Sequence, residues 1–461
     1  MQGLFENELK RLLERVSDLI QAKDLKNLSK LVEDMHTADL IEILEDLEEE
    51  EQAVLLSVLN TEEAAEVLGD VDAELFSQIL DTLTLKVKKE ILEEMAHDDI
   101  ADHFRDLEDD RIKEIMSFLN TEDAHDVREL MIYDEDTAGG LMTTEFISLD
   151  ENLTVSQAAA YLRTQAPDAE TIYYLFVIDH HGKLSGVISL RDLIIGHEND
   201  IIKDLMSTRV ISVNVSDYQE EVARIVSKYN FLAIPVVDDF NKMLGIITVD
   251  DVIDILEEEA TEDMFKFAGA SESEADFFEE SIPKRIVASI KSRLPWLIVT
   301  LFGGMLSASI ISGHTSTLNG NAKLAIFIPI LAGMGGNVGT QSSTITVRNI
   351  AVSDLKGSAV FKTIFHEMSV GLLVGFFCSA IALMASYMLY DVSPLLALVV
   401  GLSMWANIMT AATIGTVVPL IFKKIGVDPA VASAPFITMT IDITGLSIYF
   451  ALVIALLDRI A

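Results

Sequence analysis

The last third of the chain contains five apolar stretches that are each long enough to cross a lipid bilayer as a helix. They lie at about 294–312, 324–346, 368–390, 395–422 and 430–457. A helix of roughly 20 residues spans a hydrocarbon core of roughly 30 Å. Five such stretches, almost free of charge, are hard to explain as buried helices of a soluble protein. We therefore predict a transmembrane domain with five helices over residues 294–461.

Residues 1–131 follow a different pattern, in which apolar positions recur every three or four residues. The series begins with Leu9, Leu12, Leu13, Val16, Leu19 and Ile20. This spacing is typical of amphipathic helices. The segment 59–68 (LNTEEAAEVL) recurs at 119–128 (LNTEDAHDVR), which predicts helix N-caps at Thr61 and Thr121. Repetition of short helices favours an all-α superhelical N-domain, similar to an α-solenoid.

Residues 132–256 contain two copies of one motif. The segment Phe176–Ile194 aligns with Pro235–Ile253 at a constant offset of 59 residues. Upstream, the tripeptide at 141–143 (LMT) matches the tripeptide at 205–207 (LMS). Each copy predicts a strand, a turn, a second strand and a helix. The repeat resembles a tandem pair of cystathionine-β-synthase (CBS) domains, which have an α/β fold.

Each copy also carries a Gly-x-x-Ser/Thr-x-x-Asp pattern. CBS pairs often bind adenine nucleotides, and the resemblance implies that Ser189 with Asp192, and Thr248 with Asp251, hold the ribose. The same residues fit equally well as N-caps of the helices that follow. ATP binding to the CBS pair therefore stays an open alternative.

A strongly acidic helix is predicted where the repeat ends and a connecting segment, 257–293, leads to the first apolar stretch. Its carboxylates recur at helical spacing. They are Asp251, Asp254, Glu258 and Glu262, with Glu259 and Asp263 beside them. Like charges on one helical face repel each other unless a cation lies between them. Because this helix joins the two halves of the chain, a cation that neutralises it can act on the membrane part.

Charge separates the same two halves. The whole chain has a net charge of −41, with 50% hydrophobic residues. Residues 1–280 carry a net charge of −46, whereas residues 281–461 carry +5. Such acidity opposes binding to nucleic acid, whose phosphates require Lys and Arg. The single cysteine, Cys378, excludes an internal disulfide and a cysteine-based zinc site.

The loops between the apolar stretches predict how the chain is oriented in the membrane. Nine Lys and Arg residues lie before the first stretch, between the second and third, and between the fourth and fifth. Only two lie in the opposite loops and after the fifth stretch. By the positive-inside rule, the acidic half is cytoplasmic and the C-terminus lies outside.

One carboxylate lies deep in the last apolar stretch. Asp442 is accompanied by the hydroxyl groups of Thr438, Thr440, Thr444 and Ser447. A charged group at this depth costs at least about 2.5 kcal/mol, so it requires a polar partner or a polar cavity. Asp442 is either a structural carboxylate bonded to a neighbouring helix or part of a cation site, and the hydroxyls favour the cation site.

The second apolar stretch contains a glycine-rich run, Pro329–Gln341, with four glycines in seven residues. Small residues allow close packing of helices. They also leave backbone carbonyls free to line a pore, where Asn337 and Gln341 add amide oxygens. The density of glycine beside two amides favours the pore.

The order of these parts resembles the MgtE family of magnesium channels over essentially the whole chain. The most specific segments are Pro329–Gln341, Glu259–Asp263 (EATED) and the run from Asp428 to Asp442. The resemblance implies a homodimer in the bacterial inner membrane, with the ion pathway along the subunit interface. It also implies that Asp442 is the pore carboxylate, with the Thr438 backbone and the Asn337 region nearby.

The resemblance further implies regulatory magnesium sites outside the spans. Their ligands are expected among Asp251, Asp254, Glu259, Glu262, Asp263 and Asp428. Glu220, in the second CBS copy, fits an acidic position of the family, whereas Tyr218 and Asn230 stand where some relatives carry acids. In the N-domain, Asp98 and Asp99 are the candidates.

We therefore expect a channel or transporter for Mg²⁺ uptake that cytosolic Mg²⁺ closes. Mg²⁺ prefers oxygen ligands and sheds its water reluctantly, which suits one carboxylate per subunit with carbonyls and amides. The alternatives are a nucleotide-gated transporter of another divalent cation or solute, with the CBS pair as sensor, and a membrane receptor without transport. An enzyme is not expected, because the sequence shows no nucleophile–base pair, P-loop or HExxH motif.

Overall fold

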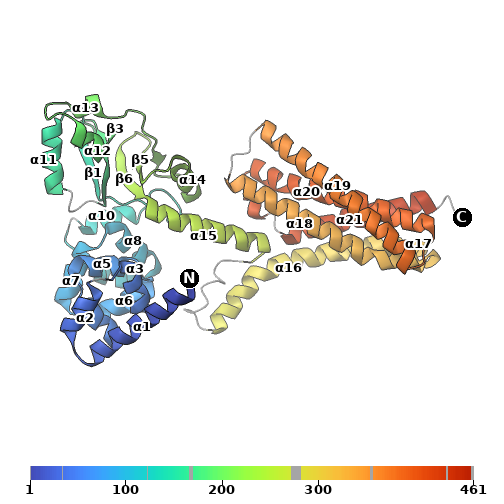
Figure 1. Ribbon diagram of the computed structural model, residues 1–461, viewed down its shortest axis with the longest axis horizontal. Helices are drawn as coiled ribbons and strands as arrows, with labels where there is room; N and C mark the ends of the chain where they lie inside the picture. The colour runs from blue at the N-terminus through green and yellow to red at the C-terminus, as the bar shows by residue number, and fades with distance from the viewer. Residues whose placement is uncertain are drawn as a thin grey trace. The chain divides into compact units, whose positions relative to one another are not determined.

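The computed structural model divides into two compact units, residues 1–256 and 257–461. It describes residues 2–33, 35–121, 123–165, 170–270, 282–352, 357–431 and 434–457. Short helices and small sheets make up the first unit, whereas long helices make up the second (Figure 1).

Ten helices, most of them short, form the N-terminal part of the first unit. They are α1 (Gln2–Gln21), α2 (Leu25–Val32), α3 (Thr37–Glu45), α4 (Glu49–Leu56), α5 (Thr61–Gly69), α6 (Ala73–Thr82), α7 (Leu85–Glu94), α8 (His97–Asp106), α9 (Asp109–Met116) and α10 (Asp123–Leu130). Their apolar faces share one core, in which Leu44, Phe76 and Phe104 are almost fully buried. The predicted all-α N-domain is confirmed.

The predicted N-caps are wrong by one residue. The cap of α5 is Asn60, whose Oδ1 accepts a hydrogen bond from the Glu63 amide at 2.8 Å. Asn120 accepts from the Asp123 amide at 3.0 Å in the same way at α10. Both Asn and Thr cap helices well, so either residue of the repeated Asn-Thr pair can serve as the N-cap. In the structure, the asparagine is the N-cap, and Thr61 is the first helical residue.

The CBS region follows in the same unit and contains two three-stranded sheets. Its elements are β1 (Phe146–Asp150), α11 (Val155–Gln165), β2 (Thr171–Ile178), β3 (Leu184–Ser189), α12 (Leu190–Ile195), α13 (Ile202–Leu205), β4 (Val213–Asn214), α14 (Gln219–Tyr229), β5 (Ala233–Val237), β6 (Met243–Thr248) and α15 (Val249–Ala268). In each sheet the first strand pairs parallel with the second, and the second pairs antiparallel with the third. The predicted repeat of strand, turn, strand and helix is therefore present twice.

The two copies exchange their N-terminal segments. Thr143 forms an antiparallel bridge with Ile246 in the second copy, and Ser207 forms one with Val187 in the first. A Cβ at Gly245 would lie 2.5 Å from the Thr143 carbonyl oxygen. At Gly186, a Cβ would lie 2.4 Å from a side-chain sulfur of this crossing segment. In each copy, the repeated glycine therefore packs against the LMT or LMS tripeptide that precedes the other copy.

Helix α15 starts directly after β6 and is 20 residues long. We predicted an acidic helix that contains Asp251 to Asp263, with the connecting segment at 257–293, and the helix begins at Val249, inside the second CBS copy. The acidic positions from Asp251 to Asp263 consequently lie on one uninterrupted helix. This helix crosses the boundary at residue 256 between the two units.

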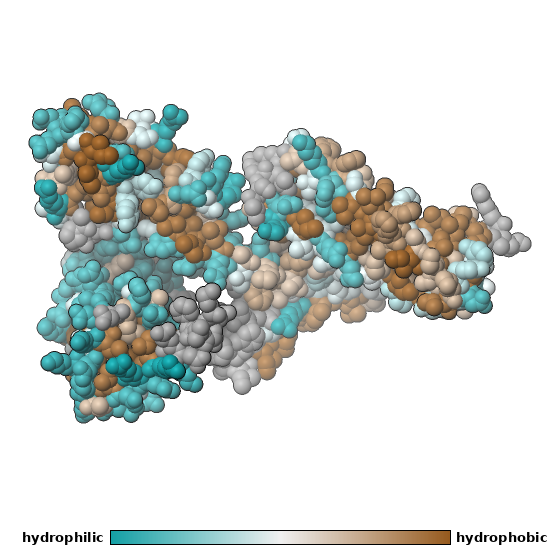
Figure 2. Space-filling view, in the orientation of Figure 1, coloured by the Kyte–Doolittle hydropathy of each residue, from teal (hydrophilic) through white to brown (hydrophobic). Residues whose placement is uncertain are grey.

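The second unit consists mainly of long helices. Its remaining elements are α16 (Ile282–Gly313), α17 (Thr315–Gly320), η3 (Ala322–Phe327), α18 (Ile328–Val352), α19 (Ser358–Leu389), α20 (Pro394–Lys424), η4 (Pro429–Val431) and α21 (Ala434–Leu457). Helix α20 contacts α18, α19 and α21 and is the most buried of the five long apolar helices. Figure 2 shows apolar side chains over much of the surface of this unit.

The part of the chain that the structure describes holds five helices that are long and apolar enough to cross a membrane, as predicted. Three of the five helices start at a different residue from the one predicted. The first begins at Ile282 instead of 294, because the basic residues Lys291 and Arg293 lower the hydropathy there without breaking the helix. The third helix begins at Ser358 instead of 368, because charged residues near its start lower the hydropathy without breaking the helix. The fifth begins at Ala434 instead of 430, because Pro429–Val431 form a short 3₁₀ turn, η4, before it.

Candidate metal sites

Asp442 lies within α21 and is half-buried. Its carboxylate forms no hydrogen bond or ion pair with any residue that the structure describes. A carboxylate within a membrane span requires a polar partner. Among the residues that the structure describes, the neighbouring helices of the same chain do not supply one.

The hydroxyl groups on α21 are oriented by their own helix. Thr438 Oγ1 donates to the Ala434 carbonyl at 2.6 Å, and Thr444 Oγ1 donates to the Thr440 carbonyl at 2.9 Å. Each hydroxyl proton is thereby used within the helix, while the oxygen keeps its lone pairs. Such oxygens can accept hydrogen bonds from the water shell of a cation.

The glycines of α18 allow neighbouring helices to approach closely. A Cβ at Gly415 on α20 would lie 2.3 Å from the Gly339 carbonyl oxygen. A Cβ at Gly336 would lie 3.0 Å from Thr438 Cγ2 on α21. A Cβ at Gly335 would lie 2.6 Å from Asn407 Nδ2 on α20. Three of the four glycines thus serve close packing, the role that the sequence analysis ranked below pore lining.

The polar side chains of the same run lie on another face of α18. Asn337 and Gln341 are exposed in this unit, and Thr344 follows them along the helix. Positions 337, 341 and 344 are one helical turn apart, so they form a polar stripe. We call Asn337, Gln341 and Thr344 the α18 stripe. This stripe lies inside a membrane-spanning helix.

Two buried polar residues of the spans were missed by the sequence analysis. Glu367 on α19 is 5% exposed, and its Oε2 accepts a hydrogen bond from Ser342 Oγ at 2.9 Å. Asn407 on α20 is 1% exposed and donates from Nδ2 to the Leu331 carbonyl at 2.7 Å. Each joins two helices. Their polarity inside apolar sequence was the available signal, although Glu367 fell one residue outside the predicted third span.

Asp428 lies just before η4 and pairs with Lys266 near the end of α15, both within the second unit. Lys266 Nζ lies 3.1 Å from Asp428 Oδ2 and 2.6 Å from Glu262 Oε1. Burial lowers the pKa of Lys266, but the hydrogen bonds to Glu262 and Asp428 outweigh it and raise the pKa overall. Two of the predicted regulatory carboxylates therefore already share a cation, the lysine ammonium. Glu259 and Asp263 are half-buried on the same helix.

In the first unit, α8 carries Asp98 and Asp99 close to carboxylates from other elements. Burial, followed by repulsion from Asp98 and Asp70, raises the pKa of Asp99 to about 8. Burial also raises the pKa of Asp251, at the start of α15, to about 7, with Asp98 adding to it. We call Asp70, Asp98, Asp99 and Asp251 the acidic junction. The structure thus brings together Asp98, Asp99 and Asp251, which the sequence left far apart.

The carboxylate of Asp99 in the acidic junction packs closely against the backbone. A Cβ at Gly69 would lie 2.3 Å from Asp99 Oδ2, so that carboxylate rests against the chain at the end of α5. Asp98 Oδ1 is buried without a hydrogen-bond partner among the described residues. Burial raises the pKa of Asp70, and repulsion from Glu66 and Asp254 adds to the rise. Buried carboxylates in this number favour binding of a proton or of a divalent cation.

The two nucleotide candidates differ in their surroundings. Ser189 caps α12, accepting from the Asp192 amide at 3.1 Å, and its hydroxyl donates to Asp192 Oδ2 at 2.6 Å. This pair is only partly covered. Thr248 Oγ1 donates to Asp251 Oδ2 at 2.8 Å, but Thr248 is buried and Asp251 belongs to the acidic junction. Ser189 is therefore an N-cap in the first copy, as the capping alternative predicts. The site in the second copy has more negative charge around it.

The remaining CBS candidates lie on or beside α14. Glu220 is exposed in the first turn of this helix, next to the exposed Tyr218 at its N-cap. Asn230 ends the helix in the left-handed conformation, with φ 53°. Its amide side chain thus occupies a C-cap, a position that asparagine tolerates well.

Comparison with known proteins assigns the chain to a family. Residues 328–452 match the MgtE divalent cation transporter domain, residues 35–136 match the MgtE intracellular N domain, and residues 138–196 and 202–258 match CBS domains. A magnesium transporter MgtE of Enterococcus faecalis is 42% identical over 72% of this chain and 71% of its own length. The chain belongs to the MgtE family. The MgtE of Thermus thermophilus is 38% identical over 79% of this chain and 80% of its own length.

Two solved structures extend the MgtE comparison to the fold of the cytosolic part. The cytosolic domain of the Mg²⁺ channel MgtE in complex with ATP matches with a TM-score of 0.51 and 38% identity, over 53% of this chain and 99% of that one. The soluble part of a magnesium transporter matches with a TM-score of 0.51 and 35% identity, over 55% and 99%. The MgtE resemblance predicted from the sequence is thereby confirmed, and the chain is a multi-pass membrane protein.

Proposed function

We propose that this protein carries Mg²⁺ across the bacterial plasma membrane through a pathway that contains Asp442. The observation that carries the proposal is a carboxylate inside a membrane-spanning helix that pairs with none of the described residues and is accompanied by hydroxyls that still accept hydrogen bonds. One carboxylate with neutral oxygens suits an ion that keeps much of its water shell. The relatives, which are magnesium transporters, support Mg²⁺ as the cargo.

The pathway is proposed to lie between two copies of the chain. The α18 stripe exposes two amides at membrane depth, where contact with lipid is unfavourable. A second copy that covers the stripe encloses it in a polar pathway and brings two Asp442 carboxylates into one pore. The excess of basic residues in alternate loops supports a cytoplasmic N-terminal half and an external C-terminus.

The acidic junction supports closure by cytosolic Mg²⁺. Without a cation, its carboxylates must either take up protons or repel one another, as the raised pKa values of Asp99 and Asp251 indicate. A divalent cation bound there favours the compact arrangement. Binding shifts the gate only if the closed state holds the cation more tightly than the open state. Helix α15 carries both Asp251 and Glu262, so it is the proposed connection to the pore.

A nucleotide has a second, modulating role in this proposal. The relative crystallised with ATP supports a nucleotide site in the cytosolic part. Of the two candidates here, the Ser189–Asp192 pair is the more accessible and lies outside the acidic junction. We propose that ATP binds at this pair and that it tunes the response to Mg²⁺ without being consumed.

Growth of a bacterial strain without Mg²⁺ uptake tests the transport step. The wild-type chain should restore growth at low Mg²⁺, and Asp442→Asn, which removes the charge at nearly constant size, should not. Asp391→Asn is the matched control, because Asp391 is exposed between α19 and α20. The Asp442 variant must still be purified as folded protein. Full rescue by Asp442→Asn would overturn the role given to Asp442.

A further inference from the structure

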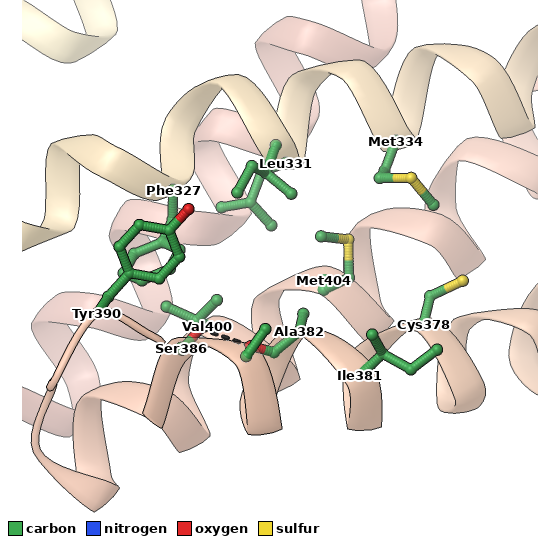
Figure 3. Close-up of a pocket in the computed structure, with 12 residues that line it drawn as sticks. Phe327, Leu331, Met334, Cys378, Ile381, Ala382, Ser386, Tyr390, Val400 and Met404 are labelled. Carbon is green, nitrogen blue, oxygen red and sulfur yellow. Dashed lines mark hydrogen bonds between the residues drawn. The ribbon is translucent and has the colours of Figure 1, made fainter. Parts of the chain in front are cut away.

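A cavity of about 340 Å³ lies among α18, α19 and α20. One face of each helix lines it, for example Leu331 and Met334 from α18, Cys378 and Ala385 from α19, and Met404 from α20. Figure 3 shows Met334 and Cys378 at one end, with Phe327 and Tyr390 at the other. Its volume falls within the roughly 300–1,000 Å³ of small-molecule sites.

The lining is apolar throughout the membrane spans. The hydroxyl of Ser386 donates to the Ala382 carbonyl at 2.6 Å, so its proton is already bonded. A cavity of this kind offers water no polar partners. An apolar group that enters it gains dispersion contacts that an empty space forfeits. The cavity therefore fits a hydrocarbon chain and not a solute that needs hydrogen bonds.

The cavity is open on the outside of the helices. Ile381 is 69% exposed and Ile330 is 41% exposed, and both line it. These helices are membrane spans, so the medium outside them is lipid hydrocarbon. An acyl chain is the apolar group present there at the highest concentration.

Polar groups gather at the rim where α19 ends. Tyr390 directly follows α19, and its ring meets Phe327 edge to face at 5.6 Å. Next to it, the exposed Lys323 ammonium donates to the carbonyl of Asp391. Tyr and Lys are typical of the level of the lipid headgroups. A cation beside the rim complements a phosphate.

We propose that this cavity binds one acyl chain of an anionic phospholipid, with the headgroup phosphate at Lys323 and Tyr390. This inference does not depend on the transported ion or on its gating. It gives the protein a specific lipid site, separate from the α18 stripe and from Asp442.

Native mass spectrometry of the full-length protein in detergent tests the site. Ala385→Phe fills the cavity, whereas Ala380→Phe, on the exposed side of the same helix, is the matched control. We expect the wild type and Ala380→Phe to retain one phosphatidylglycerol per chain after delipidating washes. Ala385→Phe should lose about tenfold or more of this retention, because the buried methylenes are displaced. Lys323→Met should weaken the binding of phosphatidylglycerol more than the binding of phosphatidylcholine.

Cys378 provides a second measurement, because it is the only cysteine in the chain. Adding phosphatidylglycerol to wild type from which even the retained lipid has been removed by exhaustive detergent exchange should slow its reaction with N-ethylmaleimide several-fold. Equal lipid retention by Ala385→Phe and Ala380→Phe would show annular lipid only and overturn the proposal. So would a Cys378 reaction rate that ignores lipid but rises when the oligomer dissociates, since a second copy would then cover the cavity.

Discussion

The structure predicts the effect of removing one charge from the acidic junction, including its magnitude. The substitution is Asp99→Asn, which keeps the shape of the side chain and removes its charge. Asp99 sits against Gly69 among the carboxylates of Asp70, Asp98 and Asp251. Removing one negative charge should stabilise α8 in the absence of divalent cations, and it should also remove a ligand for Mg²⁺. The variant is therefore expected to be more stable without Mg²⁺ and less responsive to it.

The magnitude comes from the pKa of Asp99, which is raised from 3.8 to about 8. Since one unit corresponds to about 1.4 kcal/mol, ionising Asp99 costs the folded state up to about 6 kcal/mol. The neighbouring carboxylates share this cost, so we expect about 1–3 kcal/mol to be recovered by the amide. The folded state binds the extra proton between about pH 4 and about pH 8, so wild-type stability falls as pH rises through this window. In Asp99→Asn this fall is smaller.

Hydrogen exchange of the α8 amides in the full-length protein measures the effect locally. At pH 8 with EDTA, exchange in Asp99→Asn should be about 5- to 150-fold slower than in the wild type. Adding Mg²⁺ at about 100 times its dissociation constant should slow wild-type exchange by about 100-fold, because binding to the folded state adds about 2.7 kcal/mol. The same addition should change the variant little. Asp110→Asn is the control, since Asp110 is exposed and its partner among the described residues is Lys113.

Two results would refute this reasoning. Exchange in EDTA that is as fast in Asp99→Asn as in the wild type would mean that the charges of the junction do not strain α8. An undiminished effect of Mg²⁺ in the variant would mean that Asp99 takes no part in binding the ion. Either result would remove the junction from the gating proposal.

Three further predictions rest on single contacts. Gly415→Ala should destabilise the membrane unit by about 1–3 kcal/mol, because its Cβ has no room, whereas Gly333→Ala, with open space around it, should not; thermal unfolding in detergent compares the two. Lys266→Met should lower the Mg²⁺ concentration that half-closes the channel by a few-fold, because the carboxylate of Asp428 becomes available; patch recordings that show no shift would contradict this. Asn60→Ala should cost about 1 kcal/mol in unfolding of the N-domain through loss of the cap of α5, and a chemical denaturation curve unchanged by the substitution would count against it.

The sequence predicted the architecture because its signals are local. Helical spacing, the offset of 59 residues between the repeats and the long apolar stretches each report on neighbouring residues. The same locality explains the errors. A hydropathy minimum ended the third predicted span before Glu367, although the helix continues through it to Ser358. The choice between Asn60 and Thr61 as cap depends on one hydrogen bond that the composition does not specify.

Contacts between distant segments were out of reach for the same reason. The glycine run on α18 was visible, but nothing in it says that Gly339 faces Gly415 on α20. Asp99 and Asp251 are 152 positions apart in the sequence, and only the folded chain brings them to one place. Their charges were counted correctly, whereas their burial, which raises the pKa values, follows from packing.

The two groups of regulatory carboxylates differ in how they are neutralised, and this difference bears on where Mg²⁺ is sensed. Glu262 and Asp428 already share the ammonium of Lys266, a cation tied to the chain whose concentration cannot change. In the acidic junction the raised pKa of Asp99 reflects burial and neighbouring acids, with no basic residue among its causes. At Asp98 the neighbouring His97 opposes the rise in pKa, but burial outweighs it. Most of the neutralisation of the acidic junction is therefore left to protons or dissolved cations. We therefore infer that the acidic junction gives the protein its dependence on Mg²⁺, while the Lys266 contacts keep α15 close to Asp428 at all Mg²⁺ concentrations.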